Sequence, residues 1–81
     1  MGVRTVTNRK TEYNAQVLAE RIKIALGDRT QKWLAQVTGF SVTTMWTYMN
    51  GYGNPRCDTL LLLADTLGVS CDWLLGRDGA V

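Results

Sequence analysis

The sequence contains no histidine, which removes the usual general base, metal ligand and pH switch of proteins near neutrality. Only two cysteines occur, Cys57 and Cys71, and they do not form a CxxC pair that could hold zinc. We expect both thiols to be reduced and to pack as small apolar side chains. A glycine-rich phosphate loop of the P-loop or Rossmann kind is also lacking. We therefore expect no cofactor, no metal and no enzymatic activity.

Long hydrophobic runs are missing too. The longest candidate, residues 60–64, is far shorter than the roughly 18 residues of a membrane-spanning helix. The first residues carry no apolar stretch of the signal-peptide type, so we expect a cytoplasmic protein without a membrane partner. The period-two alternation of strands is not seen either, which favours an all-α fold. With 81 residues, the chain can build one small core and therefore one domain.

Charges of both signs are present, but they are distributed unevenly along the chain. Residues 1–56 hold eight basic and three acidic side chains, whereas residues 57–81 hold one basic and four acidic ones. The net charge is therefore +5 in the first part and −3 in the second. A molecule polarised in this way would turn a basic region toward a polyanion, although scattered charges usually only solvate a surface.

Apolar residues at steps of three and four predict five helices. They are expected at residues 14–26, 31–38, 41–50, 58–67 and 71–75. Small polar residues stand at the start of four of them and can accept a backbone N–H as N-caps: Asn14, Thr30, Ser41 and Ser70. Short connections between five helices predict a compact all-α bundle.

The second and third predicted helices, QKWLAQVT and SVTTMWTYMN, are expected to form a helix-turn-helix. Gly39 separates them, and glycine enters the left-handed conformation of a sharp turn at low cost. Leu34 and Ala35 should face the core, together with either Val37 or Thr38. After the turn, the expected apolar contacts are Met45, Tyr48 and Met49.

Three segments are expected along the chain: a flexible basic arm over residues 1–11, the helix-turn-helix domain over residues 12–77, and a frayed end over residues 78–81. The arm is either a disordered tail or a segment that reaches along DNA phosphates or into a minor groove. Residues 52–56 contain the single proline and are predicted to be a loop.

A set of residues in a fixed order resembles the lambda-repressor-like helix-turn-helix family, the Cro and XRE type of phage and bacterial regulators. The matching residues are Thr30-Gln31, Leu34-Ala35, Gly39, Ser41, Met45, Tyr48, Asn50-Gly51, Pro55, residues 59–67 and GVSCDWLLG at residues 68–76. The resemblance implies a five-helix DNA-binding domain. One departure is Thr38, because the family usually has an apolar residue immediately before the turn glycine.

The resemblance also implies which residues contact DNA. Base contacts are expected from Val42, Thr43 and Thr47, with Trp46 beside them. Phosphate contacts are expected from Gln31, Lys32, Ser41, Asn50 and Arg56. Methyl groups here can meet the C5-methyl of thymine, and no arginine, asparagine or glutamine precedes Asn50 in the third helix, so specificity should depend on apolar contacts and DNA shape. Alternatively, the threonines are plain polar surface, Val42 packs on the second helix, and Trp46 is covered by a protein partner or by the loop with Tyr52.

Dimerisation on two half-sites is also implied, and the fourth predicted helix has more leucines than one inner stripe needs. The candidate interface residues are Leu61, Leu62, Trp73 and Leu74, although the last two are alternatively plain core. The expected function is a transcriptional regulator of double-stranded DNA, a phage or prophage-type repressor that binds a palindromic operator as a homodimer. The alternative is an antitoxin or another protein-interaction module on the same fold.

Overall fold

Side-chain caps begin four of the helices in the computed structural model, which describes residues 13–77. The helices are α1 (Ala15–Leu26), α2 (Gln31–Thr38), α3 (Val42–Met49), α4 (Cys57–Leu67) and α5 (Cys71–Leu74). Asn14, Thr30, Ser41 and Ser70 each accept a backbone N–H from the first turn that follows. Such a bond satisfies a donor without an intrahelical partner and typically contributes about 1 kcal/mol. The four predicted caps are confirmed.

The helix ends differ from the predicted ends by a residue or so. Helix α4 begins at Cys57, where Arg56 is the N-cap without a side-chain hydrogen bond, and α5 ends at Leu74. Helix α4 ends at Leu67. The following residue, Gly68, has a φ of 75°, and the N–H of Val69 donates to the carbonyl of Ala64 at 3.0 Å. This ending is the predicted Schellman type.

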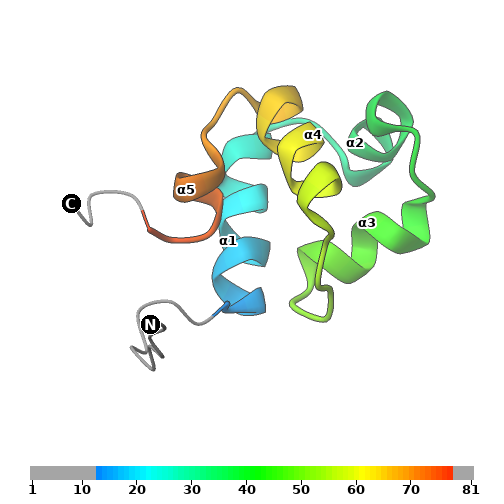
Figure 1. Cartoon of the computed structure of the whole chain (residues 1–81). Coiled ribbons are helices and arrows are strands. Elements are labelled where there is room, and N and C mark those ends of the chain that lie inside the picture. The colour runs from blue at the N-terminus through cyan, green and yellow to red at the C-terminus, as the bar shows by residue number, and fades with distance from the viewer. Residues whose placement is uncertain (1–12, 78–81) are drawn as a thin grey trace, which may run out of the picture.

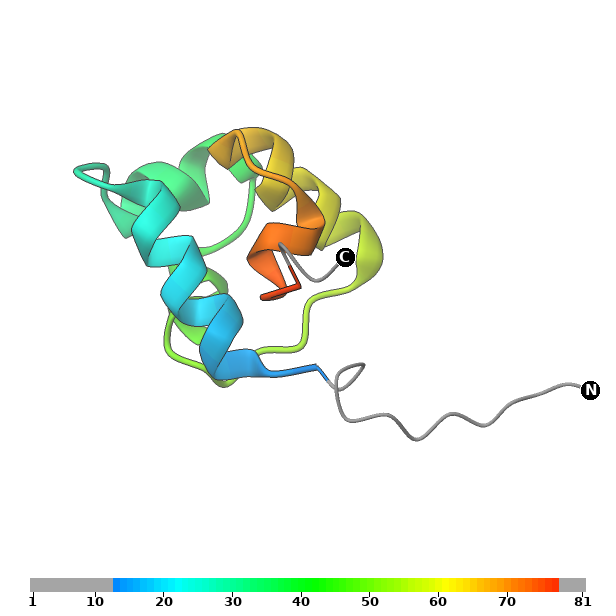
Figure 2. The same ribbon diagram turned by 90° about the vertical axis from the view of Figure 1, so that its left-hand side faces the viewer.

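The helices surround one core. Helix α1 packs against α3, α4 and α5, while α2 packs against α3 and α4 (Figures 1 and 2). The core side chains are Leu18, Ile22, Leu26, Leu34, Ala35, Met45, Met49, Leu63, Ala64, Leu67 and Leu74. All described residues from 13 to 77 lie in helices, turns or loops, so the predicted all-α fold is confirmed. None of these helices is long and apolar enough to cross a membrane.

The turn between α2 and α3 has the geometry expected of a helix-turn-helix. Gly39 has a φ of 81°, and its N–H donates to the carbonyl of Ala35 at 2.9 Å. A Cβ atom added at Gly39 would meet no atom within 4 Å, so the backbone conformation rather than crowding requires glycine here. Ala35 is buried at the same turn, where the N–H of Phe40 also donates to its carbonyl.

Thr38, rather than Val37, takes the inner position at the end of α2. Val37 is exposed, whereas Thr38 is half-buried and its hydroxyl donates to the carbonyl of Leu34 at 2.7 Å. The hydroxyl is satisfied by its own helix, so threonine can occupy the position before the turn glycine, where the family that the chain resembles usually has an apolar residue.

Two burial predictions on α4 and α5 need correction or extension. Leu74 was predicted to lie either at a dimer interface or in the core; it is completely buried, so the interface assignment is wrong and the core alternative is confirmed, because α5 packs against α1 and α4. Thr59, which was not predicted to face inward, is buried on α4, while Leu60 is half-buried against the core. The predicted arm at residues 1–11 and the predicted frayed end at residues 78–81 lie outside the described residues.

Candidate nucleic-acid interface

Helix α3 has two faces of different character. Met45 and Met49 are buried, and they fix the helix on the core. On the other side, Val42 is 47% exposed and Trp46 is 48% exposed, and they lie one helical turn apart. Thr43 is also exposed, whereas Thr47 is half-buried. The residues expected to contact bases are therefore together on the outer side of α3.

Several polar side chains near this face are hydrogen-bonded within the protein. The Thr47 hydroxyl donates to the Thr43 carbonyl at 3.1 Å, and the Asn50 amide donates to the Trp46 carbonyl at 2.8 Å. Both bonds return to the backbone of α3. The Thr47 hydroxyl proton and one of the two Asn50 amide protons are therefore used within the protein.

Gln31 connects the start of α2 to the start of α3, where Ser41 is the N-cap. The Gln31 side-chain amide donates to the carbonyl of Val42 at 3.2 Å. The Ser41 hydroxyl accepts the N–H of Thr44 at 3.0 Å and donates to the Thr44 hydroxyl at 2.9 Å. Two helix N-termini are thus held close to each other, and N-terminal N–H groups with their positive dipole ends suit a phosphate.

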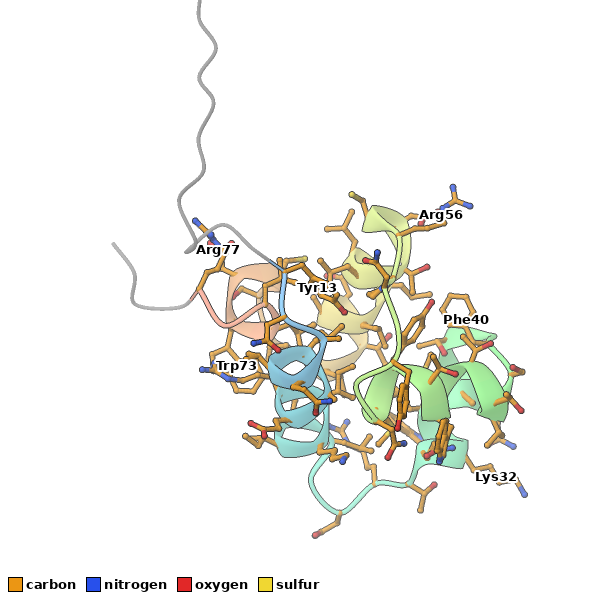
Figure 3. All side chains as sticks on the ribbon, turned by 90° about the horizontal axis from the view of Figure 1, so that it is seen from below. Tyr13, Lys32, Phe40, Arg56, Trp73 and Arg77 are labelled. Carbon is orange, nitrogen blue, oxygen red and sulfur yellow. The ribbon has the colours of Figure 1, made fainter. Side chains whose placement is uncertain are left out.

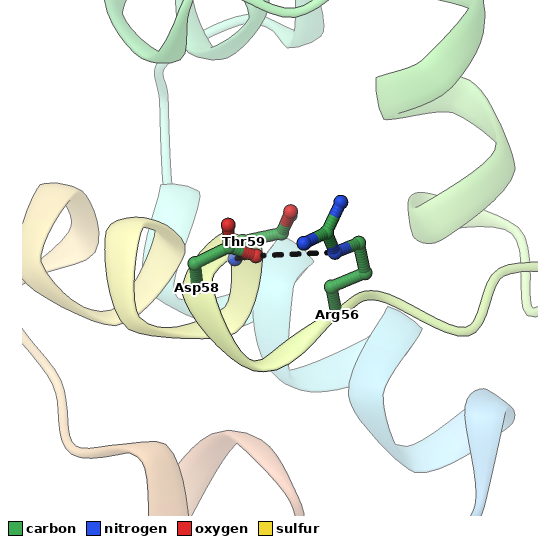
Figure 4. Close-up of polar contacts among 3 residues, drawn as sticks. All are labelled: Arg56, Asp58 and Thr59. Carbon is green, nitrogen blue, oxygen red and sulfur yellow. Dashed lines mark hydrogen bonds and ion pairs between the residues drawn. The ribbon is translucent and has the colours of Figure 1, made fainter.

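The two predicted basic contacts lie on opposite sides of α3. Both Lys32 and Arg56 are exposed, and Figure 3 shows their side chains projecting away from the protein on either side of this helix. The Nε atom of Arg56 lies 3.7 Å from the Asp58 Oδ1 atom, and both side chains are mostly exposed (Figure 4). Such an exposed ion pair contributes little free energy, so the guanidinium can exchange Asp58 for a phosphate at small cost.

Trp46 is partly covered by an aromatic residue of the following loop. Its indole ring is stacked with the ring of Tyr52, with centroids 5.7 Å apart and an interplanar angle of 9°. Tyr52 is itself 72% exposed. Trp46 was expected to contact DNA, a protein partner or the loop with Tyr52. It contacts this loop, but about half of the residue remains exposed to solvent. Tyr52 was not among the predicted contact residues.

The loop that carries Tyr52 is anchored on both sides of this residue. Gly51 packs closely on the Gln16 side chain, and Gly53 packs closely on the Tyr48 ring, where a larger residue would collide. The Tyr13 hydroxyl also donates to the Gly53 carbonyl at 2.8 Å. Burial, with a smaller effect of Tyr48, raises the pKa of Tyr13 above its ordinary value of 10.0, so the phenol remains a donor at neutral pH.

A shallow groove separates α3 from the start of α4. It encloses about 520 Å³ and is lined by Phe40, Thr44, Tyr48, Arg56, Asp58, Thr59 and Leu62. Its lining combines aromatic and aliphatic carbon with an ion pair at the rim. Leu62, which was predicted for a dimer interface, forms one wall of it.

The predicted dimer residues have different environments. Leu61 and Leu62 on α4 are 58% and 38% exposed. Trp73 is half-buried; the guanidinium of Arg21 lies 4.8 Å from its ring centroid and donates to its carbonyl at 3.1 Å. Of these four residues, only Leu61 and Leu62 are exposed apolar side chains, because Leu74 is in the core and Trp73 is half-buried.

Comparison with known proteins finds similarity to transcriptional regulators. The chain is 36% identical over 47 residues to the HTH-type transcriptional regulator AnsR of Bacillus subtilis, covering 58% of this chain and 40% of that protein. It is 38% identical over 50 residues to the cryptic phage CTXphi transcriptional repressor RstR of Vibrio cholerae, covering 62% of this chain and 45% of that protein. The chain thus spans less than half the length of these curated relatives. No family model matches it.

Solved structures share the fold. A SOS-response transcriptional repressor, LexA, from Eubacterium rectale superposes with a TM-score of 0.74 at 20% identity, over 95% of this chain and 80% of that one. A hypothetical transcription factor, NHTF, from Neisseria gives a TM-score of 0.71 at 20% identity, over 91% of this chain and 86% of that one. The predicted helix-turn-helix fold and the resemblance to helix-turn-helix regulators are confirmed.

Proposed function

We propose that this chain, with the helix-turn-helix fold of the regulators that it resembles, is a sequence-specific double-stranded-DNA-binding transcriptional regulator. The observation that carries the proposal is α3, whose inner face is fixed by Met45 and Met49 while the outer face is left open. A major groove is wide enough to admit a helix held in this way. Two relatives described as transcriptional regulators, one of them a phage repressor, support a repressor of phage or prophage type.

In this proposal, Val42, Thr43, Trp46 and Thr47 face base edges, and a second group of residues positions the domain on phosphates. That second group is Gln31, Lys32, Ser41, Asn50 and Arg56. Gln31 and Ser41 stand where α2 and α3 begin, next to backbone N–H groups without intrahelical partners. Lys32 and Arg56 add positive charge on either side of α3.

A homodimer on a palindromic operator is the proposed assembly. Leu61 and Leu62 supply exposed apolar surface on α4, and the half-buried Trp73 of α5 is the further candidate. A two-fold dimer presents two α3 helices to half-sites one helical turn apart. The regulator would act without enzymatic activity in the bacterial cytoplasm, where its DNA is found.

A second candidate function is binding to a protein partner, as in an antitoxin. The exposed Trp46–Tyr52 pair and the groove lined by Phe40, Tyr48 and Leu62 among polar residues favour it, since aromatic residues are enriched at the centres of protein interfaces. Helix α3 itself carries neither arginine nor lysine.

Selection from a random pool of DNA duplexes tests the proposed function. Recovery of a palindromic sequence, with an affinity that falls steeply as salt rises, is the result expected of phosphate contacts and a two-fold dimer. An unenriched pool, or retention that does not respond to salt, would contradict DNA binding and favour the protein-partner candidate.

A further inference from the structure

We infer that this chain selects DNA through the C5-methyl groups of thymine, on an apolar reading surface formed by Val42, Trp46 and Tyr52. The inference rests on the proposed function, in which α3 enters the major groove. It names what the surface recognises there: a methyl group on the pyrimidine, in preference to a pattern of hydrogen-bond donors and acceptors.

The first support is the state of the polar side chains around α3. The side-chain donors of Gln31, Thr47 and Asn50 are each directed at a carbonyl of α3, at 3.2, 3.1 and 2.8 Å. To donate to a base edge, Thr47 would have to give up the bond of its only hydroxyl proton, while Gln31 and Asn50 each have one amide proton beyond the one already used. Bidentate recognition of guanine or adenine, which depends on arginine, lysine, asparagine or glutamine, has no ready donor on α3.

The second support is the position of the apolar side chains. Val42 and Trp46 are four residues apart on α3, and both are about half exposed at 47% and 48%. Residues with this spacing have Cβ atoms about 5–6 Å apart. Stacked base pairs rise about 3.4 Å each. The two side chains therefore reach methyl groups that lie one or two base pairs apart along the groove.

The third support is that the aromatic part of the surface is held in place before DNA arrives. The Tyr52 ring is stacked on the Trp46 indole at 5.7 Å, and the flanking Gly51 and Gly53 are packed on other side chains. The Tyr13 hydroxyl also donates a hydrogen bond to the Gly53 carbonyl, which fixes the loop. A preorganised apolar surface loses little conformational entropy when it contacts a ligand.

Uracil provides a direct probe, because it differs from thymine only by the absence of the C5-methyl. Burial of one methyl-sized group is worth a factor of about four in affinity. In the duplex recovered by selection, replacing a contacted thymine with deoxyuridine should weaken binding about fourfold, at positions one or two base pairs apart. A 5-methylcytosine–guanine pair at the same position restores the methyl and should bind better than the unmethylated pair.

Protein variants assign the effect to the surface. With Trp46→Ala, the affinity ratio between the thymine and deoxyuridine duplexes should fall toward one at the position that faces the indole. With Trp46→Phe, which keeps an aromatic surface but loses the indole N–H, the ratio should persist. The Trp46 side chain is not part of the core, and circular dichroism checks that both variants retain the helices.

Two results would overturn the inference in distinguishable ways. If deoxyuridine is tolerated at every thymine while 7-deazapurines, which lack the N7 acceptor, weaken binding, hydrogen-bond readout replaces methyl readout and DNA binding stands. If no duplex is bound by the unaltered protein, the proposed function fails together with the inference.

Discussion

The side-chain amide of Gln31 donates a hydrogen bond to the main-chain carbonyl of Val42 at 3.2 Å, which joins the first turns of α2 and α3. One residue thus contributes to the geometry of both helix starts in the helix-turn-helix. Because the bond uses only one amide proton, the remaining amide atoms can still contact a phosphate.

Replacement of Gln31 by alanine should weaken DNA binding by about the same factor for every sequence. Loss of one hydrogen bond to a charged group corresponds to about 1.5–3 kcal/mol, or roughly one to two powers of ten. Binding isotherms for the selected duplex and a scrambled one measure the effect. Gln36→Ala is the matched control, since Gln36 is exposed on the same helix and is not among the proposed contact residues, and this variant should bind normally.

Replacement of Thr43 by alanine should change base preference at one operator position and leave binding to nonspecific DNA unchanged. Thr43 is exposed on α3, and its hydroxyl and methyl can both reach a base edge. A repeated selection with the variant reports the preference. An equal loss for all sequences, as expected for Gln31→Ala, would contradict the assignment of Thr43 to base contacts.

Replacement of Leu62 by lysine should convert the proposed homodimer into a monomer. A charge would be placed in an apolar contact, where its desolvation is costly. Sedimentation of the unaltered protein and of the variant, with and without DNA, measures the mass. Ile24→Lys is the control, because Ile24 is an exposed aliphatic residue on α1 and is not part of the proposed interface. A monomeric unaltered protein under both conditions would rule out the dimer.

Replacement of Leu34 by alanine should lower the free energy of unfolding by about 2–5 kcal/mol, because Leu34 is completely buried and the core cannot refill the space. Val37→Ala on the same helix should change it by less than about 0.5 kcal/mol, since Val37 is exposed. Urea unfolding followed by circular dichroism compares the two variants. Similar losses in the two variants would contradict the burial of Leu34 and the exposure of Val37.

The Tyr13 hydroxyl should make stability depend on pH in the alkaline range. Its pKa is raised in the folded state, mainly by burial, so the neutral phenol is favoured by folding. The contribution to stability is complete below the ordinary value of 10.0 and is lost as pH rises through the higher pKa of the folded state.

Tyr13→Phe should remove this part of the pH dependence and, through loss of the bond to Gly53, about 1 kcal/mol at neutral pH. Unfolding of both proteins at a series of pH values from neutral upward makes the comparison. If the free energies of unfolding of the two proteins changed equally with pH above the ordinary tyrosine pKa of 10.0, the Tyr13 phenol would not be the source of this pH dependence.

Much of the fold could be predicted because its signals are local. The cap at Ser41 depends on Thr44, three residues away, and the turn at Gly39 depends on one backbone conformation. These interactions link near neighbours in the chain, so the residue types and their spacing were sufficient. The outer face of α3 could be predicted for the same reason, since its inner and outer residues alternate with the helical period.

Other features depended on packing between distant segments. The burial of Thr38 in preference to Val37 depends on how α2 packs against α3 and α4, and Leu74 is buried because α5 packs on α1 and α4. A four-residue helix such as α5 has too few positions to define an apolar face by period alone.

By itself, the sequence determined the helices, their caps and the helix-turn-helix, because each is a matter of residues within about one helical turn of one another. Only the tertiary structure decided which side chains make up the surface on the outer face of α3. There Tyr52 lies over Trp46 in a loop held by Tyr13, which is 40 residues from Gly53. A contact between residues so far apart in the chain depends on how the helices pack around the core. Neither the composition nor the helical period of either segment predicts it.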